Sequence, residues 1–260
     1  MPFKDVIVER EGGVCLIKIN RPEVLNALRA DTFLDIERAL DKFSGADEMR
    51  AMIITGVGDR AFSAGGDVRA LLGMNSGDAA AFAAMTHRIL DKMEGLPKPI
   101  VAAVNGLALG AGCDLAAACD IVVASENARF GEPPTGLGIT TPFGGTQRLP
   151  RIIGPKRAKQ LFFTGETIDA GEALRFGLVN KVVSHTELLS ETRLLVGKIL
   201  ERAPIAVGYI KRLVNLSSYG GLLEGDRLES ELYARCFDTE DKGEGMKAFL
   251  EKRKPIFKGR

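Results

Sequence analysis

Residues 98–148 read KPIVAAVNGLALGAGCDLAAACDIVVASENARFGEPPTGLGITTPFGGTQR, and this stretch decides the fold of the 260-residue chain. Its first apolar run, Ile100 to Val104, predicts a strand that ends at Asn105-Gly106. The segment Gly110-Ala111-Gly112 then opens an alanine-rich run of helical character, and its glycines permit close approaches that a β-carbon would block. A helix that follows such a turn points its free N–H groups back toward the turn. That geometry suits an anion or a developing oxyanion.

One carboxylate, Asp114, lies inside the alanine-rich run. Burying a charged group is costly unless the group is paired or has a function. A structural role would be to cap local N–H groups, whereas a chemical role would be proton transfer next to the glycine turn. We favour the chemical role, because acids of this kind cluster at functional sites.

Composition excludes several classes of protein. The 35 Lys and Arg residues balance 34 Asp and Glu residues, for a net charge of +1, so no nucleic-acid partner is expected. The N-terminus, MPFKDVIVERE, is too charged for a secretory signal, and polar residues interrupt the longest apolar run, Ile100–Ser125, so neither export nor a membrane span is expected. The cysteines form no CxxC pair and indicate reduced thiols of a cytoplasmic protein: Cys15, Cys113, Cys119 and Cys236.

The first half of the chain alternates strand and helix patterns, which predicts an α/β core. Strand patterns occur at Val6–Asn20 (a hairpin around Gly12-Gly13), Ala51–Thr55, Ile100–Val104 and Ile121–Ala124, and helix patterns at Thr32–Phe43 and Ala79–Met93. Asp31 is the expected N-cap of the first helix. A second turn of small residues, Ala61–Asp67, leads into another helix.

Helix patterns dominate the second half of the chain, apart from a short strand pattern at Val179–Val183. They cover Lys156–Phe163, Ala170–Phe176, Glu187–Arg202, Pro204–Leu216, Leu222–Phe237 and Asp241–Lys252. We expect these helices to cover the core or to make subunit contacts.

A set of short motifs connects these elements to a known family. The motifs are Asn20-Arg21-Pro22 with Leu25-Asn26-Ala27-Leu28, Ala61–Asp67, Ala102–Gly106, Gly110–Leu115, Phe130-Gly131, Gly144–Leu149, Glu244-Gly245-Met246 and Phe249–Lys254. In this order and spacing, the chain resembles the enoyl-CoA hydratase/isomerase (crotonase) superfamily over essentially its full length.

The resemblance implies a crotonase-like spiral of ββα turns over residues 1–195 and a helical C-terminal trimerisation region over residues 196–260. It also implies a homotrimer or a hexamer made of two trimers. The substrate would be an acyl-CoA thioester, with coenzyme A as part of the substrate and no separate cofactor or metal. The sequence itself contains no zinc-ligand spacing, dinucleotide motif or phosphate-binding loop.

In this family two backbone N–H groups hold the thioester carbonyl, and by motif position they fall on Gly66 and Ala111. The family's usual residue at the second position is glycine, so Ala111 is a departure that keeps the N–H and adds a methyl group. Donors of this kind stabilise the enolate-like state of hydration or isomerisation. The structural alternative is that both glycine turns are only tight connections.

The acid residues depart further from the family pattern. The resemblance implies two catalytic glutamates, but Asp114 and Pro134 stand at their positions. An aspartate carboxylate is set back by ~1.5 Å relative to that of glutamate. Glu132 is the nearest replacement for the second acid, yet Pro133 biases it toward an extended conformation that is expected to aim it elsewhere. A catalytic role and a surface or subunit-contact role are therefore both open for Glu132.

Further residues are expected to contact the substrate by the same resemblance. Asp67 also suits the cap of the helix that follows it. Arg69 falls where the family places a basic residue near the CoA phosphates, with an exposed helix charge as the alternative. Lys252 matches a basic position that reaches CoA, including that of a neighbouring subunit. The full expected binding set is Val24, Ala27, Ala64, Gly66, Asp67, Val68, Arg69, Ala111, Pro134, Phe249 and Lys252.

The resemblance implies a lyase that adds water to an α,β-unsaturated acyl-CoA, with an atypical acid pair. Alternatives within the enzyme class are double-bond isomerisation with Asp114 as the single base, hydration of a cyclic dienoyl-CoA, and decarboxylation. The alternative from another class is a non-catalytic acyl-CoA-binding subunit that has lost its second acid. The two helix-opening turns and Asp114 favour the enzyme.

Overall fold

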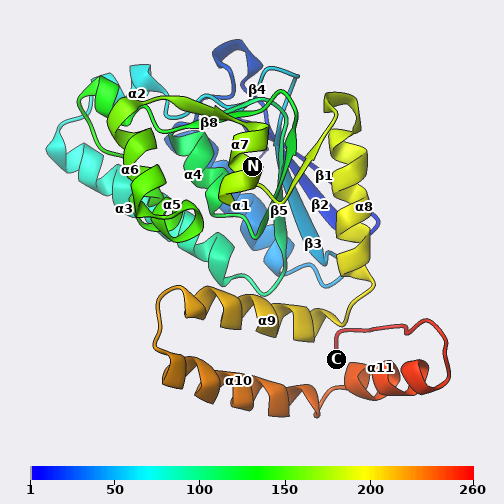
Figure 1. The fold of residues 1–260 in the computed structure, drawn as a ribbon. Helices are drawn as coiled ribbons and strands as arrows, with labels where there is room; N and C mark the ends of the chain where they lie inside the picture. Colours follow the sequence, from blue (N-terminus) through cyan, green and yellow to red (C-terminus); the bar gives the residue numbers. More distant parts are fainter. Residues whose placement is uncertain (1) are drawn as a thin grey trace.

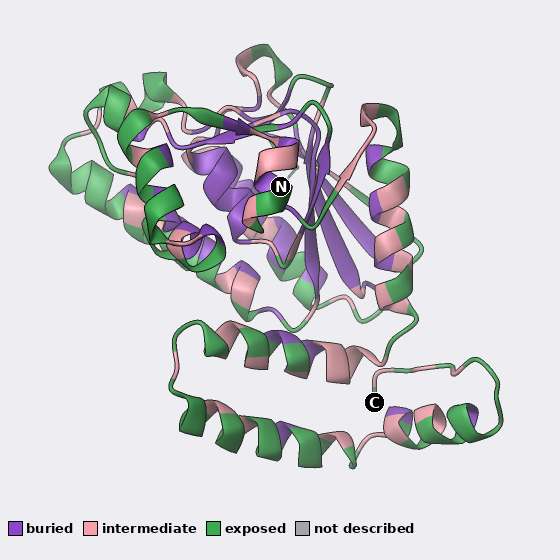
Figure 2. Cartoon of the chain, in the orientation of Figure 1, coloured by how far each residue is buried: buried purple, intermediate pink, exposed green. Residues whose placement is uncertain are grey.

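The computed structural model describes residues 2–260, and a six-stranded sheet forms the centre of the fold (Figure 1). Its strands lie in the order β1-β2-β3-β5-β7-β10, with bounds Val6–Glu11, Val14–Ile19, Ala51–Gly56, Ile100–Val104, Ile121–Ser125 and Lys181–Val183. β1 and β2 form the predicted hairpin, and every other pair in the sheet is parallel. The central strands are apolar and buried along their whole length, as expected for parallel strands covered on both faces (Figure 2).

A second sheet of short strands, in the order β4-β6-β8-β9, lies next to the first. Its strands are β4 (Ala61–Ser63), β6 (Leu107–Leu109), β8 (Arg129–Gly131) and β9 (Thr167–Asp169). β4, β6 and β8 pair in parallel, and each directly follows a strand of the first sheet and precedes a helical segment. The chain therefore winds through repeated ββα turns, which confirms the predicted α/β spiral.

Helix α1 (Ala30–Ser44) buries the predicted apolar face against the core, through Phe33, Ile36, Leu40 and Phe43. The predicted cap is wrong: Arg29, not Asp31, precedes the first helical residue. Arg29 is fixed by an ion pair, with its Nε 2.8 Å from the Asp5 carboxylate, and its backbone N–H lies 3.4 Å from the Thr32 hydroxyl. A tertiary contact with Asp5, the residue before β1, therefore helps to fix the start of this helix.

Six further helices pack around the two sheets: α2 (Val68–Leu72), α3 (Ser76–Gly95), α4 (Ala111–Ala117), α5 (Gly145–Ile153), α6 (Pro155–Thr164) and α7 (Ala170–Phe176). Short 3₁₀ turns occur at Pro22–Val24, Pro134–Leu137 and His185–Glu187. Among residues 2–260, no helix is both long enough and apolar enough to cross a membrane.

The C-terminal helices fall into two groups. Helix α8 (Leu188–Leu200) packs on β3, β5 and β7, so it belongs to the core, and the boundary expected at residues 195–196 falls inside it. Helices α9 (Pro204–Ser217), α10 (Leu222–Cys236) and α11 (Glu240–Leu250) form an extension that projects from the core (Figures 1 and 2). The helical extension therefore begins at α9.

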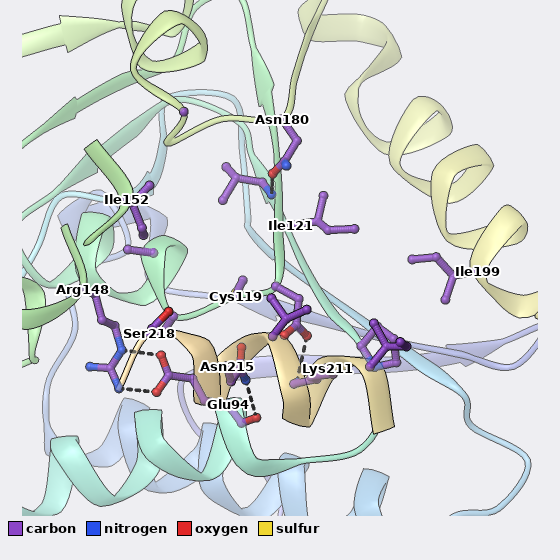
Figure 3. Close-up of a pocket in the computed structure, with 18 of the residues that line it drawn as sticks. Glu94, Cys119, Ile121, Arg148, Ile152, Asn180, Ile199, Lys211, Asn215 and Ser218 are labelled. Atoms are coloured by element: carbon purple, nitrogen blue, oxygen red, sulfur yellow. Dashed lines mark hydrogen bonds and ion pairs between the residues drawn. The ribbon is translucent and has the colours of Figure 1, made fainter. Parts of the chain in front are cut away.

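A cleft of about 630 Å³ lies where α9 meets the core (Figure 3). The buried Lys211 of α9 donates a hydrogen bond to the Met93 carbonyl at 2.9 Å, and its Nζ lies 2.8 Å from the Asp120 carboxylate. Asn215 Nδ2 donates to the Glu94 carbonyl at 3.0 Å. Polar and charged contacts therefore hold α9 against the core.

Two buried asparagines fix the turns between the sheets. Asn26, which has a left-handed backbone (φ 57°), donates from Nδ2 to the carbonyls of Val57 and Ala61 at 3.0 and 2.7 Å. Asn105 Nδ2 donates to the Gly58 carbonyl at 2.6 Å, and its Oδ1 accepts the Gly56 N–H at 3.2 Å. These amides satisfy backbone groups that the sheets leave unpaired.

Asn26→Asp should lower the free energy of unfolding by ~3 kcal/mol or more, because a carboxylate oxygen would replace two donors facing carbonyl groups. Asn20→Asp, an exposed site in the same motif, is the matched control and should change stability by less than ~0.5 kcal/mol. Urea unfolding of both variants measures the difference. Equal effects would contradict the role of Asn26.

Candidate active site

Two backbone amides on neighbouring segments have no hydrogen-bond acceptor among residues 2–260. The segment before α2 pairs with Leu28, whose N–H donates to the Gly65 carbonyl at 2.7 Å and whose carbonyl accepts the Asp67 N–H at 2.8 Å. The Gly66 N–H therefore points to the opposite side. Ala111 is the first residue of α4, so its N–H has no partner within the helix. Within residues 2–260, neither amide donates a hydrogen bond to another group.

Glycines bring these two segments together. Gly65 has a φ of +109°, and a β-carbon there would lie 2.8 Å from the Leu109 carbonyl oxygen and 3.8 Å from the Ala111 nitrogen. A β-carbon on Gly112 would lie 2.3 Å from the Ser63 carbonyl oxygen, so α4 packs directly on β4. On the other side, the Gly110 N–H donates to the Gly131 carbonyl at 2.8 Å. The start of α4 is therefore fixed between β4 and β8.

Asp114, which α4 carries, is fully buried. Its Oδ2 accepts a hydrogen bond from the Thr141 hydroxyl, and its Oδ1 has no hydrogen-bond partner within residues 2–260. Burial raises the pKa of Asp114 to about 6, against the lowering effects of the Thr141 hydroxyl, of Glu132 and of the positive charge of Arg148. Asp114 therefore changes its protonation state near pH 6, and its Oδ1 accepts no conventional hydrogen bond within residues 2–260.

Glycine at position 145 makes room for this carboxylate. A β-carbon on Gly145 would lie only 1.6 Å from Asp114 Oδ1. Gly145 is the first residue of α5, and α5 packs on α4. The free oxygen therefore occupies the space that any other residue at position 145 would fill.

Glu132 is also fully buried, and it faces Asp114 and the Cys113 thiol. Burial and the neighbouring Asp114 charge raise its pKa well above the ordinary range. Neither of its oxygens meets a conventional donor in residues 2–260, but a contact between two carboxyl groups becomes a hydrogen bond when one of them is protonated. Two charges on the buried pair are therefore disfavoured, and of the two carboxyl groups Glu132 has the more strongly raised pKa.

The structure excludes the surface reading that the sequence left open for Glu132 and corrects the expectation about its direction. It is not a surface carboxylate, and Pro133 does not turn it away from Asp114. Side chains two residues apart on an extended chain point to the same face. Glu132 follows β8 directly and is buried like Phe130, so its side chain points to the same inward face. Pro134 opens a 3₁₀ turn next to it and supplies no acid.

The expected binding residues of the N-terminal half come together beside Gly66. Ala64 N–H donates to the Leu25 carbonyl at 2.9 Å, so the segment that contains Val24 and Ala27 runs next to residues 64–68. Asp67 caps α2 as expected, because its carboxylate accepts the Arg69 N–H at 3.2 Å. Arg69 itself is exposed.

The C-terminal residues of the expected set do not reach this site in a single chain. Phe249 is 83% exposed and lies on α11, and Lys252 follows that helix. Figure 1 places α11 at the opposite end of the molecule from α2, β4 and α4. Their participation would require a second copy of the chain.

Sequence reasoning missed the groups that surround the two acids. Thr141 lies 27 residues after Asp114, in a loop with neither helical nor strand periodicity, so only the fold brings the two together. Arg148 was part of a recognised motif, but nothing in the motif indicated its ion pairs with Glu94 and Asp91. The neighbours of Thr141 in the sequence, Thr140 and Pro142, give no signal that distinguishes it.

The raised pKa of Asp114 predicts that its burial destabilises the protein as the pH rises. The folded-state pKa of about 6 exceeds the ordinary value of 3.8, so above that ordinary value the unfolded chain loses the proton first. The loss of stability should be complete once the pH passes the folded-state pKa. It corresponds to ~3 kcal/mol between about pH 4 and about pH 7.

Asp114→Asn removes this titration, so its stability relative to the natural protein should increase by that amount over the same range. Urea unfolding at a fixed protein concentration measures the change, and Asp59→Asn, at an exposed position, is the matched control. A stability difference that is constant with pH would contradict the shifted pKa.

Comparison with known proteins identifies the family. The family model described as enoyl-CoA hydratase/isomerase matches residues 9–260. The chain is 45% identical over 254 residues to the short-chain-enoyl-CoA hydratase of Clostridium acetobutylicum, covering 98% of this chain and 97% of that protein. It is 44% identical to the crotonyl-CoA hydratase of Syntrophomonas wolfei, with 99% of each covered. The fold matches a crystal structure of an enoyl-CoA hydratase from Bacillus anthracis with a TM-score of 0.95 at 36% identity, covering 99% of this chain and 100% of that one. The chain therefore belongs to the enoyl-CoA hydratase/isomerase family of enzymes.

Proposed function

We propose that this enzyme adds water to a short-chain 2-enoyl-CoA thioester. The observation that carries the proposal is the buried Asp114–Glu132 pair, one member of which lies on the same short helix as the free Ala111 amide. The free Gly66 amide lies on the segment next to that helix. Relatives named for short-chain enoyl-CoA and crotonyl-CoA hydration support the choice of substrate class.

In the proposed reaction, water attacks C3 of the substrate and transfers a proton to the ionised Asp114. The electrons of the C2–C3 double bond shift to the thioester oxygen, where the amides of Gly66 and Ala111 bind the enolate. Such donors stabilise the transition state by ~3–4 kcal/mol each. Asp114 then returns the proton to C2, which completes the addition and restores its charge. Coenzyme A is part of the substrate, and the steps require no separate cofactor.

Glu132 has a distinct part in this proposal. It keeps its own proton and hydrogen-bonds through it to Asp114, so the buried site carries one negative charge rather than two.

The absence of an acid at Pro134 favours double-bond isomerisation as a second candidate, because one carboxylate is enough to move a proton between two carbons.

Asp114→Asn should lower kcat/KM for crotonyl-CoA hydration by ~10²–10⁴-fold, because the amide cannot accept the proton. In the natural protein kcat/KM should rise with pH through about 6, as Asp114 ionises. Loss of the enoyl thioester absorbance measures the rate, and mass spectrometry separates hydration, which adds the mass of water, from isomerisation, which does not.

Glu132→Leu should also lower kcat/KM, by ~10-fold or more, because Asp114 loses the neutral hydrogen-bond donor that Glu132 supplies. Glu126→Leu, at an exposed position after β7, is the matched control and should leave the rate unchanged. If only Asp114→Asn reduces the rate, Glu132 is outside the mechanism. If neither substitution does, the acid pair does not carry the reaction.

We also propose that the protein assembles as a homotrimer, or as a hexamer of two trimers, and that one copy completes the CoA site of another. The extension exposes large apolar side chains, with Leu222, Leu223 and Phe249 each at least 80% exposed, which favours burial against another copy. Arg69 of one copy and Lys252 of another would then contact the CoA phosphates, while Phe249 would contribute apolar surface.

Mixed assemblies test this shared site. Lys252→Glu should raise KM for the thioester by ~10-fold through charge repulsion, more at low salt than at high salt. Co-expression of Lys252→Glu chains with Asp114→Asn chains should restore sites that combine an intact Asp114 with an intact Lys252. Light scattering should show three or six chains per particle. Recovery no greater than the sum of the two separate variants would contradict a site shared between copies.

A further inference from the structure

The Thr141 hydroxyl is the only conventional hydrogen-bond donor to the Asp114 carboxylate within residues 2–260. The Phe143 backbone nitrogen lies 3.4 Å from Thr141 Oγ1 and donates a hydrogen bond to it. Because that contact occupies the acceptor side of the hydroxyl, its own proton is directed toward Asp114 Oδ2. The other carboxylate oxygen, Oδ1, remains without a partner.

The loop that carries Thr141 is held from three directions. The Thr86 hydroxyl of α3 donates to the Pro142 carbonyl at 2.8 Å. Arg148 Nη1 donates to the Phe143 carbonyl at 3.2 Å. The Phe143 ring stacks on Phe33 with ring centres 5.3 Å apart and also meets Phe82 edge to face.

Arg148, which holds the Phe143 carbonyl, is itself held in place by ion pairs. Its Nε donates to Glu94 at 2.7 Å and one Nη to Asp91 at 2.9 Å, both from α3 (Figure 3 shows the pairing with Glu94). The guanidinium is 8% exposed and also fills the space over Gly144. Bidentate pairs of this kind hold a guanidinium in one orientation. The position of the Thr141 hydroxyl is therefore set by the fold rather than by loop motion.

We propose that Thr141 is a positioning residue that keeps Asp114 in its charged form and directs its Oδ1 to the reacting proton. This inference rests on the proposed function of Asp114 as the base. A hydrogen bond to a carboxylate favours the ionised form, and it also fixes which oxygen remains free. Without the hydroxyl, only the contact with Glu132 would act directly on the carboxyl group, so both its charged form and its orientation would lose support.

Other ionisable groups near the same carboxyl group also affect the pKa of Asp114. Glu132, after β8, and the Cys113 thiol, on α4, lie on one side. Arg148, on α5, supplies the nearest positive charge, and Glu94 and Asp91 of α3 neutralise most of it. The β4 and β6 residues packed on α4 carry no titratable side chain. A change confined to the Thr141 hydroxyl leaves all of these groups in place.

Thr141→Val removes the hydroxyl and keeps the shape of the side chain, and Thr141→Ser keeps the hydroxyl. The valine variant should raise the pKa of Asp114 by roughly one unit, seen as an upward shift of the acidic limb of the kcat/KM profile. Its kcat near pH 6 should fall by ~10-fold or more, with KM changed by less than ~2-fold. The serine variant should stay within ~3-fold of the natural protein. Thr140→Val, at the exposed neighbouring position, is the matched control.

The carboxyl pKa is measured separately, in the substrate-free protein, by carbon NMR of labelled aspartate with Asp114→Asn for assignment. An upward shift in Thr141→Val but not in Thr141→Ser supports the proposal even if no enoyl-CoA is converted, in which case only the proposed function fails. An unchanged carboxyl pKa and pH profile in the valine variant would overturn the proposal, as would a serine variant that behaves like valine. Thr141→Ala carries the same expectation and decides the matter if the valine variant does not fold.

Discussion

Two carboxyl groups buried in contact cannot both be charged without a large energetic cost, and the site of this protein is built around that constraint. Burial and the neighbouring Asp114 charge raise the pKa of Glu132 well above its ordinary range, whereas the pKa of Asp114 is raised to about 6. The surrounding structure then stabilises one charged oxygen and frees the other. The ββα winding supplies the frame, because it brings α4, the residue after β8 and the start of α5 to one point.

Much of the fold follows from local pattern. The strand Ile100–Val104 was predicted with the bounds that the structure shows, because a run of apolar residues between proline and Asn-Gly has few alternatives. The short strands β4, β6, β8 and β9 were not separated from their neighbours by the sequence pattern. Three residues are too few to show a period. β4, β6 and β8 form because the parallel winding stacks successive turns, and β9 adds to them as an antiparallel edge strand.

The site was predictable where a single residue contradicted its surroundings. Asp114 was prominent in the sequence because an acid lies in an alanine-rich run, whereas the direction of Glu132 depended on which face of β8 is inward. Thr141 and Gly145 act through contacts with a residue about thirty positions earlier, and no local pattern encodes such contacts. The distance of Phe249 and Lys252 from the site likewise depends on the whole chain, because α9 directs the extension away from the core.

The close fit of Asp114 between Thr141 and Gly145 has a consequence for substitutions. A glutamate at position 114 would carry its carboxylate ~1.5 Å further, beyond both the hydroxyl that holds Oδ2 and the space that Gly145 leaves for Oδ1. The aspartate, the threonine and the inward-facing Glu132 therefore form a co-adapted set, in which the value of each residue depends on the others. The effect of a substitution at any one of these positions should therefore depend on which residues stand at the other two.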